Sequence, residues 1–221
     1  MSAKILFNKL HEAGVIGASG ETYFELHGLK TKVRDSSIVG NVIQEWLKLF
    51  MNNHKIPFRF KPNSQDFPDF LMHASDDGID LLEVKCFKKS PNFDVANFSA
   101  YCRSLLNSPY RLDSDYLIIE YKENDDGSIL IKRAWLKKVW EICTGSERAK
   151  VKAQWKQGTP VNIRPATFYS NKAKYQPFLT RKEFVLALKS IIDVNPNMNH
   201  IQKDWYKKVS ELYKTQTGND I

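Results

Sequence analysis

PDFLMHASDDGIDLLEVK, residues 68–85, is the stretch that decides the fold. Two apolar runs, 67–73 and 79–87, flank an Asp-Asp-Gly segment at 76–78. Aspartate followed by glycine is typical of the turns that join two paired strands. The stretch therefore predicts a β-hairpin.

The second strand of this hairpin carries charge within an apolar sequence. Side chains alternate between the two faces of a strand. One face holds Leu81, Glu83, Lys85 and Phe87, and the other holds Asp80, Leu82, Val84 and Cys86. If the two strands pair, Asp69 of the first strand lies close to Glu83 and Lys85. Asp66, three residues earlier, is the alternative for this carboxylate.

Two carboxylates and an ammonium on one part of a sheet suit phosphate chemistry. Carboxylate oxygens are ligands for a hard divalent cation such as Mg²⁺. A neighbouring ammonium can orient an attacking water or offset charge on a phosphate. The alternative is a surface hairpin with solvated charges, but Glu83 and Lys85 interrupt a run that is too apolar for an exposed edge.

The pair Pro68-Asp69 followed by Glu83-Val84-Lys85 resembles the PD and (D/E)XK elements of the PD-(D/E)XK nuclease superfamily. The resemblance covers residues 36–121. It implies that Asp69, Glu83 and the backbone carbonyl of Val84 ligate Mg²⁺, and that Mn²⁺ can replace Mg²⁺. It also implies that Lys85 positions or activates the attacking water.

A helix is expected over about 36–53. Its apolar stripe at helical spacing consists of Ile38, Val42, Trp46, Leu49 and Phe50. Glu45 lies at the edge of this stripe. In the resembled superfamily a helix before the hairpin often supplies an extra acidic residue, and Glu45 is the position that would match it. The alternative is an ordinary surface carboxylate.

The rest of the sequence predicts helices alternating with strands. Strands are expected at 57–61, 115–122, 128–132 and 161–164, and helices at 1–13, 95–107, 136–143 and 180–192, with a last amphipathic helix through Trp205, Val209 and Leu212. This order predicts an α/β protein with a mixed central β-sheet flanked by helices. The resemblance to the PD-(D/E)XK superfamily implies that this fold is restriction-endonuclease-like. We expect a single nuclease domain over 1–221, with a core at about 36–145 and a basic DNA-binding part at about 146–221.

The charge of the chain is distributed unevenly. The net charge of the 221 residues is +8. Residues 1–126 hold 15 Lys and Arg against 18 Asp and Glu, whereas residues 127–221 hold 18 against 7. A basic half beside an acidic, metal-suited half indicates a phosphate-rich polymer held over a cation site. The alternative for the charge alone is a Lys-rich soluble surface.

The three cysteines, Cys86, Cys102 and Cys143, are odd in number and widely spaced. This pattern indicates reduced thiols and shows no zinc spacing. No stretch approaches the ~20 apolar residues of a membrane span, and the N-terminus lacks a signal-peptide pattern. We therefore expect a cytoplasmic, prokaryotic protein without a membrane partner.

Candidate DNA contacts fall in three segments. They are Lys88 and Lys89 after the hairpin, Asn97, Ser99, Tyr101 and Arg103 in the helix over 95–107, and Asn162, Arg164, Lys172 and Lys174 in the basic C-terminal part. Arg and Asn are residue types that read guanine and adenine edges by paired hydrogen bonds. An ordinary amphipathic helix, and a basic loop that contacts phosphate only, are the alternatives.

The segment N-I-R-P at 162–165 and the residues Phe178, Arg181, Glu183 and Phe184 of an F-x-x-R-x-E-F helix are similar to the NgoBV group of type II restriction endonucleases. This resemblance implies Mg²⁺-dependent hydrolysis of double-stranded DNA at a short specific sequence. One motif per chain then predicts a homodimer, because cutting two antiparallel strands needs two centres or two visits and a two-fold dimer matches the symmetry of a palindromic site. The alternative arrangement is a monomer that nicks each strand in turn. Alternatives are another nuclease of the superfamily, such as a repair nickase, junction resolvase or RNA-processing enzyme, and a catalytically inactive DNA-binding protein.

Overall fold

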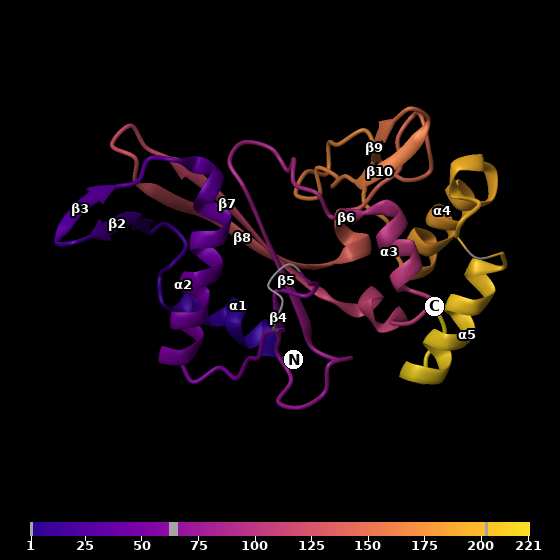
Figure 1. The fold of residues 1–221 in the computed structure, drawn as a ribbon, viewed down its shortest axis with the longest axis horizontal. Helices are drawn as coiled ribbons and strands as arrows, with labels where there is room; N and C mark the ends of the chain where they lie inside the picture. Colours follow the sequence, from indigo (N-terminus) through magenta and orange to yellow (C-terminus); the bar gives the residue numbers. More distant parts are fainter. Residues whose placement is uncertain (1, 62–65, 202) are drawn as a thin grey trace. The chain divides into compact units, whose positions relative to one another are not determined.

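The computed structural model describes residues 2–61, 66–201 and 203–221. The chain forms two compact units (Figure 1). The first contains Met1–Ser90 and Asp115–Leu136, and the second contains Pro91–Ser114 and Lys137–Ile221. The chain therefore passes from the first unit to the second twice.

The first unit is built around a five-stranded sheet. The strand order is β1 (Ser19–Gly20), β8 (Ile129–Lys138), β7 (Asp115–Glu123), β5 (Leu81–Phe87) and β4 (Phe70–Leu71). The helices are α1 (Ser2–Glu12) and α2 (Val39–Asn53), and the 3-10 helix η1 (Ser36–Ile38) leads into α2. Strands β2 (Tyr23–Leu26) and β3 (Leu29–Lys32) form a separate hairpin.

The sheet is mixed, as the sequence predicts. β4 is antiparallel to β5, with Phe70 opposite Leu82. β5 is parallel to β7, with Val84 beside Leu117. Parallel neighbours need a long connection between them, and most of that connection, Pro91–Ser114, belongs to the second unit.

One face of the sheet is buried against α1 and α2 (Figure 1). The core there contains Leu6 and Leu10 of α1, Ile43 and Leu47 of α2, Leu82 and Val84 of β5, and Leu117 and Ile119 of β7. Because side chains alternate along β5, burial of Leu82 and Val84 places Glu83 and Lys85 on the opposite face. The predicted division of this strand into two faces is confirmed.

The helix predicted over 36–53 is confirmed, but its predicted apolar stripe is wrong. The buried side chains of α2 are Val39, Ile43, Leu47, Phe50 and Met51. Trp46 and Leu49 were predicted to be buried, but they are 40% and 64% exposed. The helix is therefore rotated by about one residue from the predicted orientation. The apolar sequence alone did not specify which of two adjacent stripes packs on the sheet.

The link between β4 and β5 is longer than the tight turn that was predicted. Met72 N–H donates to the carbonyl of Asp80 at 2.8 Å, so the strands are joined by a loop over 73–79. The Asp76 carboxylate accepts from the Gly78 N–H at 2.7 Å, which shapes this loop. The strand predicted at 57–61 is reduced to a single bridge between Arg59 and Leu71.

The helix predicted over 136–143 is wrong. β8 continues to Lys138 and is followed by the 3-10 helix η3 (Val139–Ile142). Trp135 of β8 stacks on Phe87 of β5, with ring centroids 5.9 Å apart. This packing on the sheet favours the extended backbone over the helix that local composition indicates.

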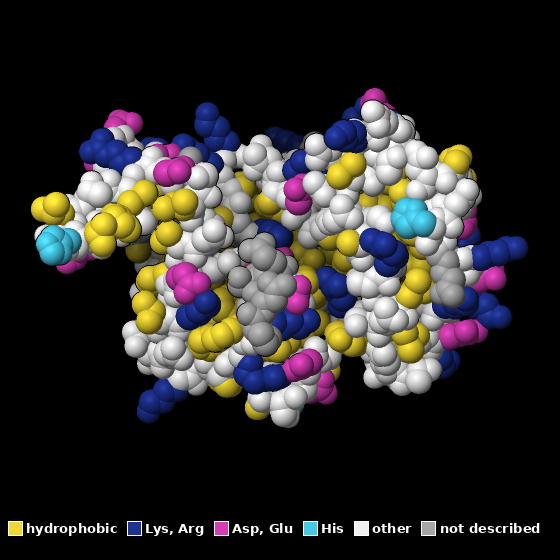
Figure 2. Space-filling view, viewed as in Figure 1, with side chains coloured by type: hydrophobic (Ala, Val, Ile, Leu, Met, Phe, Trp, Pro, Cys, Tyr) yellow, Lys and Arg dark blue, Asp and Glu magenta, His cyan; other side chains and the backbone are white. Residues whose placement is uncertain are grey.

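The β2–β3 hairpin exposes apolar side chains. Tyr23, Phe24, Leu26 and Leu29 are 47%, 55%, 65% and 78% exposed. Figure 2 shows hydrophobic side chains gathered along this hairpin. A contiguous group of exposed apolar side chains is a feature typical of interaction surfaces.

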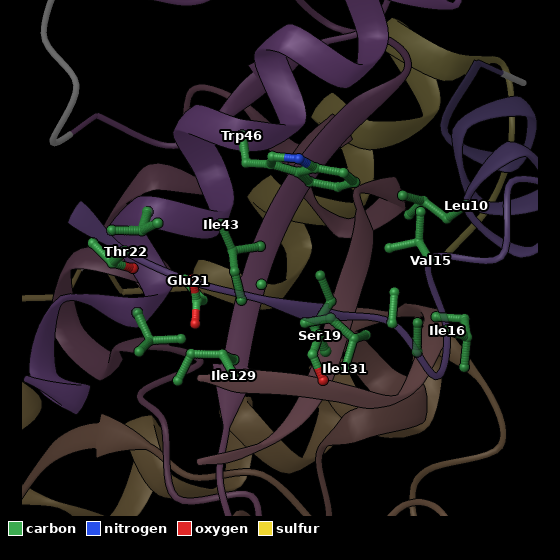
Figure 3. A pocket seen from close by; sticks show the side chains of 16 residues that line it. Leu10, Val15, Ile16, Ser19, Glu21, Thr22, Ile43, Trp46, Ile129 and Ile131 are labelled. Atoms are coloured by element: carbon green, nitrogen blue, oxygen red, sulfur yellow. The ribbon is translucent and has the colours of Figure 1, made fainter. Parts of the chain in front are cut away.

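An apolar pocket of about 190 Å³ lies within the first unit (Figure 3). Ile43 and Trp46 of α2 face Ile129 and Ile131 of β8 across it. Glu21 also lines it, but this carboxylate is paired with Lys32 at 2.7 Å. The lining of this pocket is therefore suited to an apolar group and not to acid, base or metal chemistry.

The second unit has a three-stranded antiparallel sheet in the order β6 (Ala96–Asn97), β10 (Thr159–Ile163) and β9 (Ala153–Lys156). Its helices are α3 (Phe98–Ser104), α4 (Arg181–Val194) and α5 (Trp205–Thr217), with the 3-10 helices η2 (Pro109–Asp113) and η4 (Pro196–Met198). Buried Trp205 donates from Nε1 to the carbonyl of Cys102 at 2.7 Å and joins α5 to α3. Thr180 caps α4 by accepting from the Glu183 N–H at 3.1 Å.

The fold class is confirmed, since a mixed sheet flanked by helices forms the first unit. The assignment of residues 1–221 to one nuclease domain stays a prediction. Among the described residues, no helix combines the length and the apolar character needed to cross a membrane.

Candidate active site

The pairing of β4 with β5 brings two carboxylates together. Phe70 lies opposite Leu82, so the same register places Asp69 opposite Glu83. The Val84 N–H donates to Asp69 Oδ2 at 2.7 Å, and the Asp69 N–H donates to Glu83 Oε2 at 3.3 Å. Asp69 therefore caps the end of the short strand, and its carboxylate is held against the backbone of β5.

Lys85 completes the group predicted from the sequence. Its Nζ lies 2.9 Å from Glu83 Oε1. The two side chains are 22% and 11% exposed, so the ion pair is largely removed from solvent. The structure thus brings together Asp69, Glu83 and Lys85, all from the first unit, and we call them the carboxylate–lysine cluster.

The environment disfavours negative charge on Asp69. Burial is the largest cause, the neighbouring Glu83 carboxylate is the second, and together they raise the pKa of Asp69 to about 6. Hydrogen bonds from the Val84 N–H and the Gln44 side chain, and the charge of Lys85, act in the opposite direction. A bound cation would relieve the repulsion between the two carboxylates.

Gln44, and not Glu45, is the residue of α2 that contacts the cluster. The Gln44 side chain hydrogen-bonds to the Asp69 carboxylate. Glu45 is 71% exposed and pairs with Lys48 at 2.6 Å. Both residues line a small cavity of about 60 Å³ beside Asp69, with Asp66 also at its wall. The sequence analysis missed Gln44 because it placed the buried stripe of α2 one position too early.

The carboxylate–lysine cluster has the ligands for a hard divalent cation. The described residues contain no group of three or more His, Cys, Asp or Glu side chains arranged around one ion. Magnesium, however, is usually held by one or two carboxylates, with water and substrate phosphate completing its shell. Asp69 and Glu83 supply such a pair, and their mutual repulsion fits a cation between them. The role of the Val84 carbonyl stays a prediction.

The predicted DNA contacts of the first unit lie just beyond β5. Lys88 and Lys89 are both exposed. Lys88 pairs with Glu123 at 2.5 Å. That ion pair would have to open before Lys88 could bind a phosphate. The exposed Lys89 ammonium would only have to exchange bound water for the phosphate.

The predicted DNA contacts of α3 have differing surroundings. Asn97 accepts from the Ala100 N–H at 2.9 Å and caps the helix. Ser99 lies 2.6 Å from the His200 ring, and Arg103 is exposed. Tyr101 is 2% exposed and packs against Phe184 in the core of the second unit. Tyr101 in this position supports the fold, and its side chain is not accessible to DNA.

The C-terminal candidates are accessible. Lys172 is exposed, and Lys174 is exposed and paired with Glu147. Asn162 and Arg164 lie at the end of β10 in a polar network with Asp94 and Gln154. The sequence analysis missed Asp94 because it is 68 residues from Asn162, and it missed Gln154 because the sequence does not show that β9 pairs with β10.

Comparisons with known proteins identify relatives over the whole chain. The NgoBV restriction endonuclease family model matches residues 1–221. The type II restriction enzyme NlaIV of Neisseria lactamica is 36% identical over 225 residues, covering 100% of this chain and 93% of that enzyme. The type II restriction enzyme NgoBV of Neisseria gonorrhoeae is 37% identical over 145 residues, covering 64% of this chain and 82% of that enzyme.

A solved structure of the NlaIV restriction endonuclease has a TM-score of 0.93 to this chain at 36% identity, covering 100% of this chain and 92% of that one. The similarity confirms the restriction-endonuclease-like fold. The resemblance to the NgoBV group, which was predicted from the N-I-R-P and F-x-x-R-x-E-F segments, is confirmed as well.

The raised pKa of Asp69 predicts a pH-dependent stability in the absence of metal. A carboxyl whose pKa is raised from 3.8 to about 6 in the folded protein destabilises the fold when it is ionised. This cost is absent below pH 3.8 and complete above pH 6. In EDTA, Asp69→Asn should therefore increase the free energy of unfolding at pH 8 by on the order of 1–3 kcal/mol, and the gain should shrink toward pH 5.

Urea denaturation at several pH values measures this difference. Asp66→Asn, which changes an exposed carboxyl of the same unit, is the matched control and should have little effect at any pH. A gain for Asp69→Asn that does not change with pH would mean that charge on Asp69 is not its cause.

The contact between Gln44 and Asp69 predicts a role in metal affinity. Removing a hydrogen bond that orients a metal-binding carboxylate typically weakens metal binding by about 10-fold or more. Gln44→Leu should weaken Mn²⁺ binding to this extent, as measured by electron paramagnetic resonance of free Mn²⁺. Glu45→Gln, at the adjacent exposed position, should leave the affinity within about 2-fold. The opposite result for the two variants would return the role to Glu45.

Proposed function

The chain belongs to the NgoBV restriction endonuclease family, and from this premise we propose that it uses Mg²⁺ to hydrolyse both strands of duplex DNA at the carboxylate–lysine cluster. Its family and its two named relatives make it a type II restriction endonuclease, a site-specific endodeoxyribonuclease. The observation that carries the proposal is the register that sets Asp69 opposite Glu83, with Lys85 on the same strand face.

Asp69 and Glu83 are the residues that would hold a divalent cation in this site. Bound Mg²⁺ offsets charge on the phosphate and lowers the pKa of a water molecule, which makes that water a nucleophile at neutral pH. The Val84 N–H keeps the Asp69 carboxylate in place through its 2.7 Å hydrogen bond. Gln44 holds the same carboxylate from the side of α2.

Lys85 supplies a second positive charge at the site, in addition to that of the metal ion. Its ion pair with Glu83 holds the ammonium beside the two carboxylates. From there it can orient the attacking water or stabilise the charge that develops on the phosphate oxygens. Mn²⁺ prefers similar oxygen ligands and is expected to substitute for Mg²⁺.

The second unit has the charge expected of a DNA-binding part. It holds 18 Lys and Arg against 9 Asp and Glu, while the first unit holds 15 against 16. Since phosphate contacts dominate affinity for duplex DNA, we assign most of the DNA contacts to the second unit. The three cysteines of the chain, Cys86 in the first unit and Cys102 and Cys143 in the second, are all free. Free thiols support our proposal that the enzyme acts in the cytoplasm of a prokaryote.

A homodimer is the proposed active species. Each chain carries one carboxylate–lysine cluster, and a two-fold dimer would present one cluster to each strand of a symmetric site. The β2–β3 hairpin offers the contact surface, because Phe24, Leu26 and Leu29 are all more than half exposed. A second copy of the chain would remove this apolar surface from water.

The proposed roles predict the effect of replacing each member of the cluster. Asp69→Ala, Glu83→Ala and Lys85→Ala should each lower the cleavage rate by at least about 100-fold, because each removes charge placed next to the reacting phosphate. Circular dichroism should show that the variants remain folded. Asp66→Ala is the matched control and should cleave at nearly the wild-type rate. Activity in Asp69→Ala together with its loss in Asp66→Ala would transfer the role to Asp66.

The proposed dimer predicts a second phenotype. Replacing both Leu26 and Leu29 by Lys places two like charges on each hairpin and should separate the copies. Sedimentation on a duplex should then show one chain per DNA, and digestion of a plasmid should accumulate nicked circles. Val194→Lys adds charge at another exposed apolar position, 78% exposed in α4, and should leave assembly unchanged. A double variant that still cuts both strands together would contradict the role of the hairpin.

A further inference from the structure

The three-stranded sheet of the second unit aligns three amide side chains. Asn162 of β10 lies opposite Gln154 of β9 on one side and opposite Asn97 of β6 on the other. Residues directly opposite each other in a sheet project from the same face. Asn97 uses its side-chain oxygen to cap α3, which leaves Gln154 and Asn162 as the adjacent pair of interest.

Arg164 and Asp94 form hydrogen bonds with Gln154 and Asn162 and an ion pair with each other. Arg164 Nη2 donates to Gln154 Oε1 at 2.8 Å, and its Nη1 lies 2.8 Å from Asp94 Oδ1. Arg164 Nη1 also donates to the carbonyl of Asn92 at 2.7 Å. Asn162 Nδ2 donates to Asp94 Oδ2 at 3.0 Å and to Gln154 Oε1 at 3.4 Å.

The chemistry of these partners fixes which end of each amide faces the network. A guanidinium can only donate, so Gln154 must turn its oxygen toward Arg164. An ionised carboxylate can only accept, so Asn162 must turn its NH₂ group toward Asp94. The other ends then face away from the network. Gln154 presents a donor, Nε2, and Asn162 presents an acceptor, Oδ1.

The guanidinium of Arg164 is engaged by three different groups of the protein. Direct bidentate contact with guanine would require it to give up Gln154 and Asp94 together. Its side chain is 28% exposed, whereas Gln154 is an exposed residue. Arg164 is thus better placed to orient the two amides than to contact a base.

We propose that Gln154 and Asn162 read base edges in the major groove as a fixed donor–acceptor pair, and that Arg164 and Asp94 are positioning residues that set their orientation. This inference rests on the proposed action on duplex DNA and deepens it. Gln154 Nε2 fits an acceptor such as purine N7, guanine O6 or thymine O4. Asn162 Oδ1 fits an exocyclic amine, adenine N6 or cytosine N4.

The test is a selection of preferred sequences from duplexes with a randomised central segment. Binding is selected in Ca²⁺, so that the result does not depend on cleavage, and a parallel arm selects cleaved ends in Mg²⁺. Gln154→Ala and Asn162→Ala should each relax the preference at one base-pair position, by on the order of 10-fold in the ratio of bound sequences. Arg164→Ala should relax the preference at these same positions and at no additional one.

Gln154→Glu is the sharpest variant. It retains the oxygen that Arg164 requires and replaces the outward NH₂ group by an oxygen. The preference at the position read by residue 154 should therefore change from base edges with an acceptor to edges with an amine. Asp94→Ala removes the direct partner of Asn162 and leaves the hydrogen bond from Arg164 to Gln154 in place, so it should relax the position that Asn162 reads more than the position that Gln154 reads. Circular dichroism establishes that each variant is folded.

Lys172→Ala is the matched control, because it removes an exposed charge of the same unit outside the network. It should weaken the binding of all sequences alike. An unchanged sequence profile for Gln154→Ala, or a new relaxed position in Arg164→Ala alone, would overturn the inference. A wild-type protein that selects a sequence in Ca²⁺ but cuts nothing in Mg²⁺ would instead contradict the proposed function and leave the inference supported by its binding profile.

Discussion

The candidate active site depends on one strand register. The hydrogen bond from the Val84 N–H to Asp69 lies immediately before β4 begins, and it holds Asp69 opposite Glu83 of β5. A shift of one residue would move Glu83 and Lys85 to the face that packs against α1 and α2. Burial of Leu82 and Val84 in that core makes such a shift costly. Packing of the hydrophobic core therefore fixes the strand register on which the arrangement of the active-site residues depends.

The hairpin could be predicted from the sequence because strand patterns carry strong local information. With a period of two residues, one apolar residue on β5 determines the face of every other. A helix is harder to orient, because a shift of one residue rotates the pattern by only about 100°. On α2 two neighbouring apolar stripes exist, and the exposed one contains Trp46 and Leu49. The predicted contact from this helix was consequently assigned to Glu45, although Gln44 reaches Asp69.

The errors elsewhere arise from interactions over long sequence distances. The end of β8 has a helical composition, yet Trp135 packs on Phe87, and this contact holds the backbone extended. Tyr101 was predicted on a DNA-facing helix, but the chain places Phe184 of α4 against it and buries the ring. In neither case does the neighbouring sequence identify the partner. Period and turn residues describe a segment, whereas burial depends on what packs against it.

The carboxylate–lysine cluster and the network around Gln154 also differ in how far apart their residues lie in the sequence. Asp69 and Glu83 are joined through a hairpin, so residues that act together are also close in the sequence. The network around Gln154 joins Arg164 and Asn162 to Asp94, about seventy positions earlier. Asn162 and Arg164 could be selected by residue type, but their surroundings could not. Those surroundings change the role of Arg164, because a guanidinium already bound to a carboxylate and an amide acts through the groups that it orients. Residue type indicates what a side chain can bind. The contacts that the side chain already makes within the protein determine which of its polar atoms are still available to bind DNA.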